Sequence, residues 1–348
     1  MTTPDAGASQ ARAHATIRDV AKLAGVGIKT VSRVINDEPN VSALTHRNVM
    51  RAISELNYRP NYNAGSLRRS GGKTQTFGLV VGNVANRFWG AVHRGVEDVA
   101  SEHNVAVLAA SLDDDTAREE RIIGELLSRR VDGLILATVR PDQSALVVEQ
   151  QRGIPIVFVD REPENIDADV VVTNNRGGAE QATAHLIAHR HRRIGYLGEP
   201  GGMSQAQRRR MGFNDALAAA GIAASDSPVI DDLRDSDAAH AATLEMLTRA
   251  DAPTALFSSQ NHVTIGALHA LRELGLQREI AIVGFNDVAL GDLIEPGLTA
   301  MAQNPYQMGR IAAARAFARL EGDTVSQRIV VRSVLIPRGS GEIPPRRT

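Results

Sequence analysis

The segment from residue 16 to residue 69 constrains the fold of this chain most, and it opens with a capped amphipathic helix. Thr16 stands one residue before a stripe of apolar side chains, and Asp19 follows it three residues later. A Thr and an acidic residue at this spacing form a capping box, which satisfies two backbone N–H groups at a helix start. The pattern predicts a first helix along the stripe, which consists of Ile17, Val20, Ala21 and Ala24.

A second short helix is predicted after a tight turn at Gly25, because Val31, Val34 and Ile35 repeat at helical spacing. Two helices joined by a short turn with glycine form a helix-turn-helix, whose second helix enters the major groove of DNA. The predicted readers of the base edges are Ile28, Lys29 and Arg33.

A third helix is predicted after Ser42, a good helix-capping residue, with Val49, Ile53 and Leu56 on one face. Two short helices alone bury little apolar surface, and the third can close a small core. Residues 16–60 are therefore expected to fold as a self-contained three-helix domain.

The strings DVAKLAGV, TVSRVIN, NVS and LNYRPN occur in this order and at the spacing of the LacI/GalR family of bacterial transcriptional regulators. The chain resembles this family over essentially its whole length after an N-terminal tail. The resemblance implies a homodimer that binds a near-palindromic double-stranded DNA operator. It also implies a hinge segment, residues 61–72, that folds on specific DNA and wedges Leu67 into the minor groove. The implied DNA contacts are Thr16, Ile28, Lys29, Thr30, Ser32, Arg33, Asn36, Asn40, Tyr58, Asn61, Ala64, Leu67 and Arg68.

Charge is divided unevenly along the chain. Between Thr16 and Ser70 nine basic residues face four acidic ones, a net charge of +5, whereas the whole chain carries −1 and the remainder therefore −6. A basic head attracts phosphates where the groove would be read, and an acidic remainder stays off the DNA.

Composition excludes several classes of protein. With 348 residues, 43% of them hydrophobic, the chain can bury more than one core. The absence of cysteine excludes disulfide scaffolds, thiolate zinc sites and cysteine nucleophiles. No apolar run reaches the length of a membrane span, and the polar start MTTPDAGASQARAHA lacks the apolar core of a signal peptide. We therefore expect a cytoplasmic protein without membrane contact, whose residues 1–15 form a disordered tail.

Beyond residue 72, β-like runs alternate with amphipathic helical segments, which predicts an α/β core of parallel sheets flanked by helices. FGLVVGN, VAVLAASL, GLILAT and IPIVFVD form a first series, and RIGYLG, PVI, TALFSS and IAIVGFN a second. The resemblance implies a two-lobed core like that of periplasmic binding proteins over residues 73–348. The first lobe is expected over about 73–173 and 304–338, and the second over about 174–303. The C-terminal IVVRSVLI is expected to form one strand, and the Pro-rich tail after it carries no tetramerising heptad.

Ligands of open α/β sheets bind beyond the carboxyl ends of the strands. The family's pocket for a small-molecule effector, transferred to this chain, consists of Phe88, Trp89, Asp160, Gln207, Arg209, Leu233, Gln260, Asn286 and Gln303. Sugar-binding relatives usually carry Arg in place of Gln207 and Asp in place of Asn286. Because charged groups bind hydroxyls strongly, we expect an anionic or amide-rich effector more than a sugar, with Arg208 and Arg210 facing solvent or that ligand.

Glycine departs from the family pattern at two positions of the DNA-binding part. Gly27 replaces a capping Ser, at a cost of a few tenths of a kcal/mol. Gly65 weakens the hinge helix by about 1 kcal/mol, which makes its folding more dependent on DNA.

Two patterns invite a metal or catalytic reading. His185 and His189 are four residues apart with His191 just beyond, but a basic cluster at a helix C-terminus explains them better. The acidic run from Asp113 to Asp115 is explained by the start of a helix. We expect no cofactor, metal or catalytic residue, since the chain has no P-loop, no GxSxG and no GxGxxG after a strand.

The sequence therefore predicts a transcriptional repressor whose operator affinity is controlled by an effector bound between the two lobes. Two alternatives remain: a solute-binding protein without DNA function, and an α/β enzyme. The helix-turn-helix and the missing export signal argue against a solute-binding protein. The missing catalytic motifs argue against an α/β enzyme.

Overall fold

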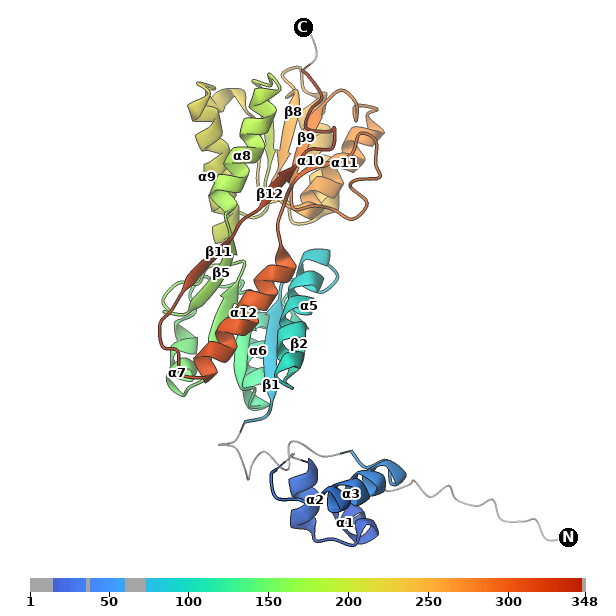
Figure 1. Ribbon diagram of the computed structural model, residues 1–348. Coiled ribbons are helices and arrows are strands. Elements are labelled where there is room, and N and C mark those ends of the chain that lie inside the picture. The colour runs from blue at the N-terminus through green and yellow to red at the C-terminus, as the bar shows by residue number, and fades with distance from the viewer. Residues whose placement is uncertain (1–14, 36–37, 60–72, 346–348) are drawn as a thin grey trace, which may run out of the picture. The chain divides into compact units, whose positions relative to one another are not determined.

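The computed structural model describes residues 15–35, 38–59 and 73–345, and the chain forms two compact units, Met1–Thr74 and Gln75–Thr348 (Figure 1). The tail up to residue 14 and the predicted hinge lie outside the described residues. So do five of the predicted DNA contacts, Asn36, Asn61, Ala64, Leu67 and Arg68.

The described residues of the N-terminal unit form three helices, α1 (Ile17–Ala24), α2 (Ile28–Ile35) and α3 (Ala43–Glu55). The predicted capping box is confirmed: the Thr16 hydroxyl accepts from the Asp19 N–H at 3.4 Å, and the Asp19 carboxylate accepts from the Thr16 N–H at 2.8 Å. Gly25 ends α1 in the left-handed conformation at φ 66°, which a residue with a Cβ adopts at a cost. The buried core of the unit consists of Val20, Ala21, Val31, Val34, Val49 and Ala52.

Unit Gln75–Thr348 contains two six-stranded sheets with the same internal order. The first runs β11-β5-β4-β3-β1-β2 and is parallel throughout. The second runs β12-β10-β9-β8-β6-β7 and is parallel except for β12. The strands of the first sheet are β1 (Thr76–Val81), β2 (Ala106–Ser111), β3 (Gly133–Leu136), β4 (Ile156–Val159), β5 (Asp169–Thr173) and β11 (Arg328–Val331). Those of the second are β6 (Ile194–Leu197), β7 (Val229–Ile230), β8 (Ala255–Ser258), β9 (Ala281–Phe285), β10 (Thr299–Ala302) and β12 (Val334–Ile336).

Helices cover both faces of each sheet (Figure 1). The alternation of side chains along β1 shows the layering: Phe77, Leu79 and Val81 join one core with α5 and α12, while Val80 joins another with α6. In the second lobe, α8 and α9 share one core and α10 and α11 the other.

The helices of this unit have the following bounds: α5 (Arg87–Glu102), α6 (Thr116–Ser128), α7 (Val147–Gln151), α8 (Asn175–Ala188), α9 (Ser204–Ala219), α10 (Ser236–Thr248), α11 (Asn261–Glu273) and α12 (Pro305–Leu320), with short 3-10 turns η1 (Ser144–Leu146) and η2 (Ala224–Asp226).

The predicted fold class is confirmed, and each predicted βα series is present. Strands β5 and β10 and helix α12 were not predicted from the sequence pattern. Helix α8 begins at Asn175. The pair Gly177–Gly178 lies in its first turns, and glycine weakens any helix pattern.

The expectation of one C-terminal strand was wrong. IVVRSVLI forms β11, which pairs with β5 in the first sheet, and β12, which pairs antiparallel with β10 in the second. The chain thus returns to the second lobe after β11, within the segment 304–338 that was expected to belong to the first lobe. The break falls at Arg332 and Ser333, where the Ser333 N–H and hydroxyl donate to the Asn174 Oδ1 at 2.6 and 2.8 Å. Asn174 lies between β5 and α8, where the chain passes from the first lobe to the second. The hydrogen bonds therefore join this connection to the one between β11 and β12.

Helices α5 and α12 pack so closely that glycine is required where they cross. A Cβ on Gly95 would lie 2.1 Å from the Tyr306 carbonyl oxygen, and one on Gly309 would lie 2.1 Å from that of Val92. The two helices therefore contact through their backbones, with a glycine on each side.

Gly95→Ala is expected to lower the free energy of unfolding by about 1–3 kcal/mol, because the added methyl forces apart two backbones of the first-lobe core. Urea unfolding of the full chain measures the effect. Gly90→Ala in the same helix is the matched control, since a Cβ there meets nothing within 4 Å. It should be neutral or stabilise by about 1 kcal/mol. Equal losses in both variants would contradict the close approach.

No helix in the described part of the chain is both long and apolar enough to span a bilayer.

Candidate nucleic-acid interface and effector site

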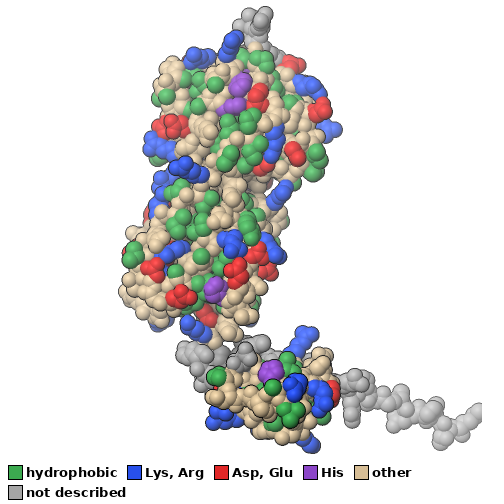
Figure 2. Space-filling model, in the orientation of Figure 1, with side chains coloured by type: hydrophobic (Ala, Val, Ile, Leu, Met, Phe, Trp, Pro, Cys, Tyr) green, Lys and Arg blue, Asp and Glu red, His purple; other side chains and the backbone are tan. Residues whose placement is uncertain are grey.

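The N-terminal half of α2 presents an exposed face. Ile28, with 45% of its surface exposed, and Lys29 point away from the core, whereas Val31 and Val34 are buried. The carbonyl of Gly27 accepts from the N–H groups of Thr30 and Val31 at 2.9 and 3.1 Å, so the helix starts without a side-chain cap there. Lys and Arg side chains are spread over the face of this unit drawn in Figure 2. An exposed apolar residue beside cations suits a surface that meets base edges and phosphates together.

The other described DNA candidates differ in their surroundings. Arg33 is exposed and forms a loose ion pair with Glu38 at 3.7 Å, and Thr30 and Ser32 are half-buried. Asn40 is exposed with a positive φ of 76°. Tyr58 packs against the three-helix core, and this burial raises the pKa of its hydroxyl. The Thr16 hydroxyl is engaged in the capping box, where it donates to Asp19 at 2.7 Å.

In the second unit, Asp160 and Asn286 occupy equivalent places in the two lobes. Asp160 follows β4 with φ 69°, and Asn286 follows β9 with φ 72°. The backbone N–H of each donates to the neighbouring strand, at 2.8 Å to Val171 and at 3.0 Å to Met301. Both side chains are buried, and the Oδ1 atom of each has no hydrogen-bond partner. The left-handed backbone turns each side chain at the carboxyl edge of its sheet, where ligands of such sheets bind.

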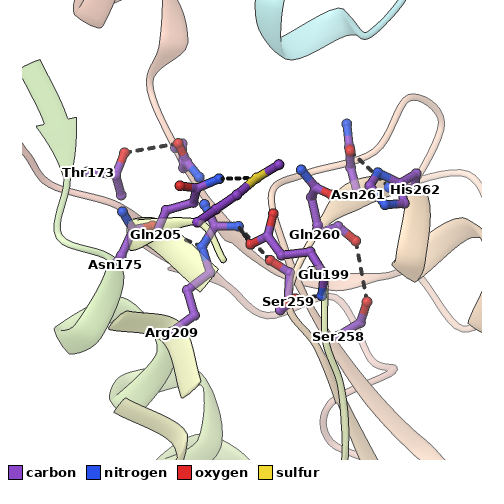
Figure 3. Close-up of polar contacts among 12 residues, drawn as sticks. Thr173, Asn175, Glu199, Gln205, Arg209, Ser258, Ser259, Gln260, Asn261 and His262 are labelled. Atoms are coloured by element: carbon purple, nitrogen blue, oxygen red, sulfur yellow. Dashed lines mark hydrogen bonds and ion pairs between the residues drawn. The ribbon is translucent and has the colours of Figure 1, made fainter. Parts of the chain in front are cut away.

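Arg209 on α9 organises the second-lobe side of this edge (Figure 3). The guanidinium is almost fully buried and donates to the Glu199 carboxylate at 2.8 Å, the Asn175 Oδ1 at 2.9 Å and the Ser259 carbonyl at 2.7 Å. It also lies over the Phe285 ring at 4.2 Å. The predicted pocket residue Arg209 is therefore held by the protein itself, as the anchor for its neighbours.

Two buried carboxyl groups lie near Arg209, and each has an oxygen without a partner: Oδ1 of Asp160 and Oε2 of Glu199. Burial raises the pKa of both groups, and the charge of Arg209 opposes this shift. The charge of Asp160 further raises the pKa of Glu199, so the two carboxyls interact across the lobes. Unpaired carboxylate oxygens in a buried site are costly unless a ligand completes them.

Side-chain amides complete the cluster. The Oε1 of Gln205 and the Nε2 of Gln303 are buried without partners. The Thr173 hydroxyl donates to the Gln303 Oε1 at 2.9 Å, which orients that amide. Gln260, half-buried before α11, accepts through its backbone carbonyl from Thr264 and Ser258.

Gln207 lies outside the buried cluster. Its side chain is exposed and donates to the Gly201 carbonyl at 3.0 Å. Gln205 is the buried glutamine of α9. Successive helix residues are about 100° apart, so Gln205 and Arg209, four residues apart, share a face, while Gln207 lies between them on the other side.

Phe88, Trp89 and Leu233 lie in hydrophobic cores. Phe88 and Trp89 form an edge-to-face pair with ring centroids 4.9 Å apart in the first-lobe core, and Leu233 lies in a second-lobe core. Trp89 nevertheless reaches the carboxyl edge of β1, because its Nε1 lies 2.6 Å from where a Cβ on Gly82 would be. These residues shape the wall of the site more than its polar interior.

Polar contacts join the two lobes on both sides of the cluster. Asn86 and Asn261 exchange amide hydrogen bonds at 3.3 and 2.8 Å. On the other side, the Arg208 guanidinium pairs with Glu162, whose N–H donates to the Ser204 hydroxyl at 3.2 Å. Arg208 is therefore engaged with the opposite lobe, and Arg210 pairs with Asp231 at 3.2 Å and lies over the Tyr196 ring. Neither arginine faces the cluster, which removes the support for an anionic effector that we drew from them.

The three histidines near the end of α8 have separate partners. His185 Nε2 bonds to Glu342, and His189 Nδ1 contacts the carbonyl of His185 at 2.9 Å. His191 is fully buried, with Nε2 at 2.7 Å from the Ile343 carbonyl and Nδ1 at 2.8 Å from the Thr254 hydroxyl. The carbonyl can only accept, so Nε2 carries the hydrogen and Nδ1 can accept from Thr254. No group of three or more possible metal ligands occurs among the described residues.

Burial lowers the pKa of His191 below its ordinary value of 6.5, and this gives stability a pH dependence. Below pH 6.5 the unfolded chain takes up a proton that the folded chain resists, so this stabilisation is present above that pH and is lost as the pH falls. We expect the urea midpoint to fall between about pH 7.5 and about pH 5.5, and to fall less in His191→Gln. An identical pH dependence in both proteins would contradict this role of His191.

The acidic run before α6 acts as expected at a helix start. Asp115 caps the helix, accepting from the Ala117 and Arg118 N–H groups at 2.9 and 3.1 Å. Asp113 and Asp114 pair with Arg118 and Arg161, both at 2.8 Å.

Three members of the buried cluster were not found from the sequence: Asn175, Glu199 and Gln205. Glu199 follows the second-lobe strand YLG directly, so its place after a strand end was the available signal. Asn175 and Gln205 lie in the first turns of α8 and α9, where only the packed lobe shows which face turns inward.

A three-helix DNA-reading unit with an exposed recognition helix, followed by two parallel-sheet lobes with polar groups at their carboxyl edges, defines a ligand-responsive DNA-binding regulator. The family model described as "Bacterial regulatory proteins, lacI family" matches residues 16–61, and that of the "Periplasmic binding protein-like domain" matches residues 183–341. The chain belongs to the LacI family of bacterial transcriptional regulators, as its similarity to curated members shows.

Two such relatives come from Escherichia coli strain K12. The HTH-type transcriptional regulator GalR is 36% identical over 308 residues, which cover 87% of this chain and 89% of the relative. The ribose operon repressor is 31% identical over 330 residues, which cover 94% and 99%. Among solved structures, the lac repressor dimer bound to operator and the anti-inducer ONPF matches with a TM-score of 0.83 at 25% identity, covering 94% of this chain and 99% of that one. The predicted class, a DNA-binding transcriptional regulator, is confirmed.

Proposed function

We propose that this protein is a repressor that binds a near-palindromic operator as a homodimer, and that a small-molecule effector between its lobes controls the operator affinity. The lac repressor is a dimer on its operator in the solved structure. A two-fold symmetric protein reads a two-fold symmetric site, with one recognition helix in each half-site. Such a regulator works on the chromosome, in the cytoplasm.

One observation carries the proposal for the core. Polar atoms without partners lie at the carboxyl edges of both sheets. Asp160 follows β4 of the first sheet, Glu199, Asn286 and Gln303 follow strands of the second, and Gln205 lies in the first turn of α9. Buried polar groups are nearly always paired in proteins, so this arrangement is suited to a ligand. We assign effector contact to these five residues with Gln260 nearby, and the wall to Phe88, Trp89 and Leu233.

The proposal includes binding and no catalysis. The similar proteins GalR and the ribose operon repressor of Escherichia coli are a transcriptional regulator and a repressor, which supports binding without catalysis. An effector that binds one lobe arrangement better than the other shifts the equilibrium by its difference in affinity, typically about 1–3 kcal/mol.

The recognition helix is tested by replacing Ile28, Lys29 and Arg33 together with alanine in the full chain. Because these side chains are exposed, the thermal transition should stay in place while binding to a selected operator is lost. Arg51→Ala on α3 is the control, since its side chain is 72% exposed and it removes a cation of the same unit. Undiminished operator binding by the triple variant would rule out α2 as the reader.

Lys29→Ala alone is expected to relax base preference at one position of each half-site, at a cost of about 1–3 kcal/mol against the preferred base. Lysine donates to the guanine acceptors O6 and N7, so the lost preference should concern a guanine. Selection from random duplexes with wild type and variant measures it. If the two proteins select the same site with the same base frequencies, Lys29 contacts only phosphate or solvent.

A further inference from the structure

Most of the unpaired atoms in the cluster are oxygens, which accept hydrogen bonds. Asp160, Glu199, Gln205 and Asn286 each have an oxygen without a partner, whereas the nitrogens without a partner are the Gln303 Nε2 and the Nε of Arg161 beside Asp160. A ligand that completes this set must donate many hydrogen bonds and accept few. An anion accepts only, so it fits this set poorly.

The buried charges do not balance. Arg209 is bonded to Glu199, and Arg161 is bonded to Asp114 at 2.8 Å and to the Thr138 carbonyl at 3.1 Å. These pairings leave the carboxylate of Asp160 unpaired at Oδ1. Asp160 and Glu199 against Arg209 give a net charge of −1 when all three are ionised, and a buried charge without a counterion is costly.

The two carboxyls come from opposite lobes. Asp160 follows β4 of the first sheet, and Glu199 stands two residues after β6 of the second. The charge of Asp160 raises the pKa of Glu199, so the two carboxylates repel each other when both are ionised. A cation between them replaces this repulsion by two attractions, and it does so only in lobe arrangements that bring the two carboxylates together.

We propose that the effector carries a protonated amine, which binds between Asp160 and Glu199, together with a hydroxyl or carbonyl oxygen that accepts from Gln303. This inference rests on the proposed effector site and names the class of its ligand: an amino sugar or amino alcohol. An ammonium group has three donors and no acceptor, and it supplies the missing charge. A neutral sugar can donate to the same oxygens but leaves the charge uncompensated.

The test uses the full chain and two matched sets of probes that differ in charge. The first set is D-glucosamine, D-glucose and D-gluconate, and the second is 4-amino-1-butanol, 1,4-butanediol and 4-hydroxybutyrate. At saturation, the amine of at least one set should raise the melting temperature by about 5 °C, while its neutral and acidic counterparts leave it unchanged. Equal stabilisation by a neutral or acidic counterpart, or no response to either amine, overturns the proposal.

Asp160→Asn locates the amine. The variant keeps the side-chain shape and should bind the responding amine at least about tenfold more weakly, which calorimetry measures. Asp232→Asn is the control. Asp232 has a similarly positive φ, 66° against 69° for Asp160, but its side chain is exposed on the surface of the same unit. Glu199→Gln, which keeps an acceptor for Arg209, is a second variant expected to weaken binding. Unchanged affinity in both site variants overturns the proposal.

The failure of this inference differs from failure of the proposed function. If a neutral or acidic metabolite stabilises the protein and alters operator affinity, the proposed function as an effector-controlled regulator is kept, and the proposal of an amine effector is rejected. If the full chain selects no operator, the proposed function fails whatever binds to the core.

Discussion

Replacing Arg209 with methionine is expected to lower the free energy of unfolding by about 3–5 kcal/mol, the cost of removing one partner of a buried ion pair. The change leaves the Glu199 carboxylate buried without its cation. It also removes the hydrogen bonds that Arg209 donates to the Asn175 Oδ1 and the Ser259 carbonyl. Urea unfolding of the full chain measures the loss.

The neighbouring residue provides the matched control. Arg210→Met removes the same charge from the same helix, but its partner Asp231 is half exposed and the pair is longer, at 3.2 Å. The loss there should be below about 1 kcal/mol. In the double variant Arg209→Met, Glu199→Met neither member of this ion pair is left without its partner, so much of the lost stability should return. A double variant as unstable as Arg209→Met alone would show that the ion pair is not the cause.

Asp169→Ala is expected to have an effect of similar size, about 3–5 kcal/mol, in the first lobe. Asp169 is fully buried at the start of β5 and accepts from Arg315 at 2.9 Å, from Arg319 at 2.6 Å and from the Gln327 N–H at 2.9 Å. Its carboxylate thus joins α12 to the segment that enters β11, and its loss leaves two guanidinium groups without their shared anion. The urea midpoint should fall, while the operator preference should change little because the N-terminal unit reads the DNA bases.

Asp323→Asn tests whether burial decides the effect of Asp169→Ala. Asp323 pairs with the same Arg315 at 2.8 Å, but its side chain is 32% exposed. Water can replace much of that interaction, so the loss should be clearly smaller than in Asp169→Ala. Equal losses would show that the charge of Arg315, and not the buried position of Asp169, controls stability.

Much of the fold could be predicted because local patterns and tertiary structure agree. The Thr16 capping box, the Gly25 turn and the apolar stripes specify the three-helix unit without long-range information. The alternating series of strands and helices likewise specifies two parallel sheets. The division of IVVRSVLI between two sheets could not be read locally, because both halves are equally β-like and only the bonds of Ser333 to Asn174 reveal the crossing.

The candidate site was predicted less completely. Residues directly after strands, such as Asp160 and Asn286, were found because strand ends define the binding edge. Residues on helices were not, since the inward face of α9 depends on how the helix packs: it buries Gln205 and Arg209 and exposes Gln207. The partners that hold Arg209 come from three separate segments, and no sequence spacing brings them together.

Selection from random duplexes by the intact protein is the decisive measurement of its function. We expect enrichment of one near-palindromic site with two half-sites, bound by a dimer, and loss of that enrichment when Ile28, Lys29 and Arg33 are replaced by alanine. A well-folded full-length protein that shows no preference for any duplex over bulk DNA would contradict this expectation.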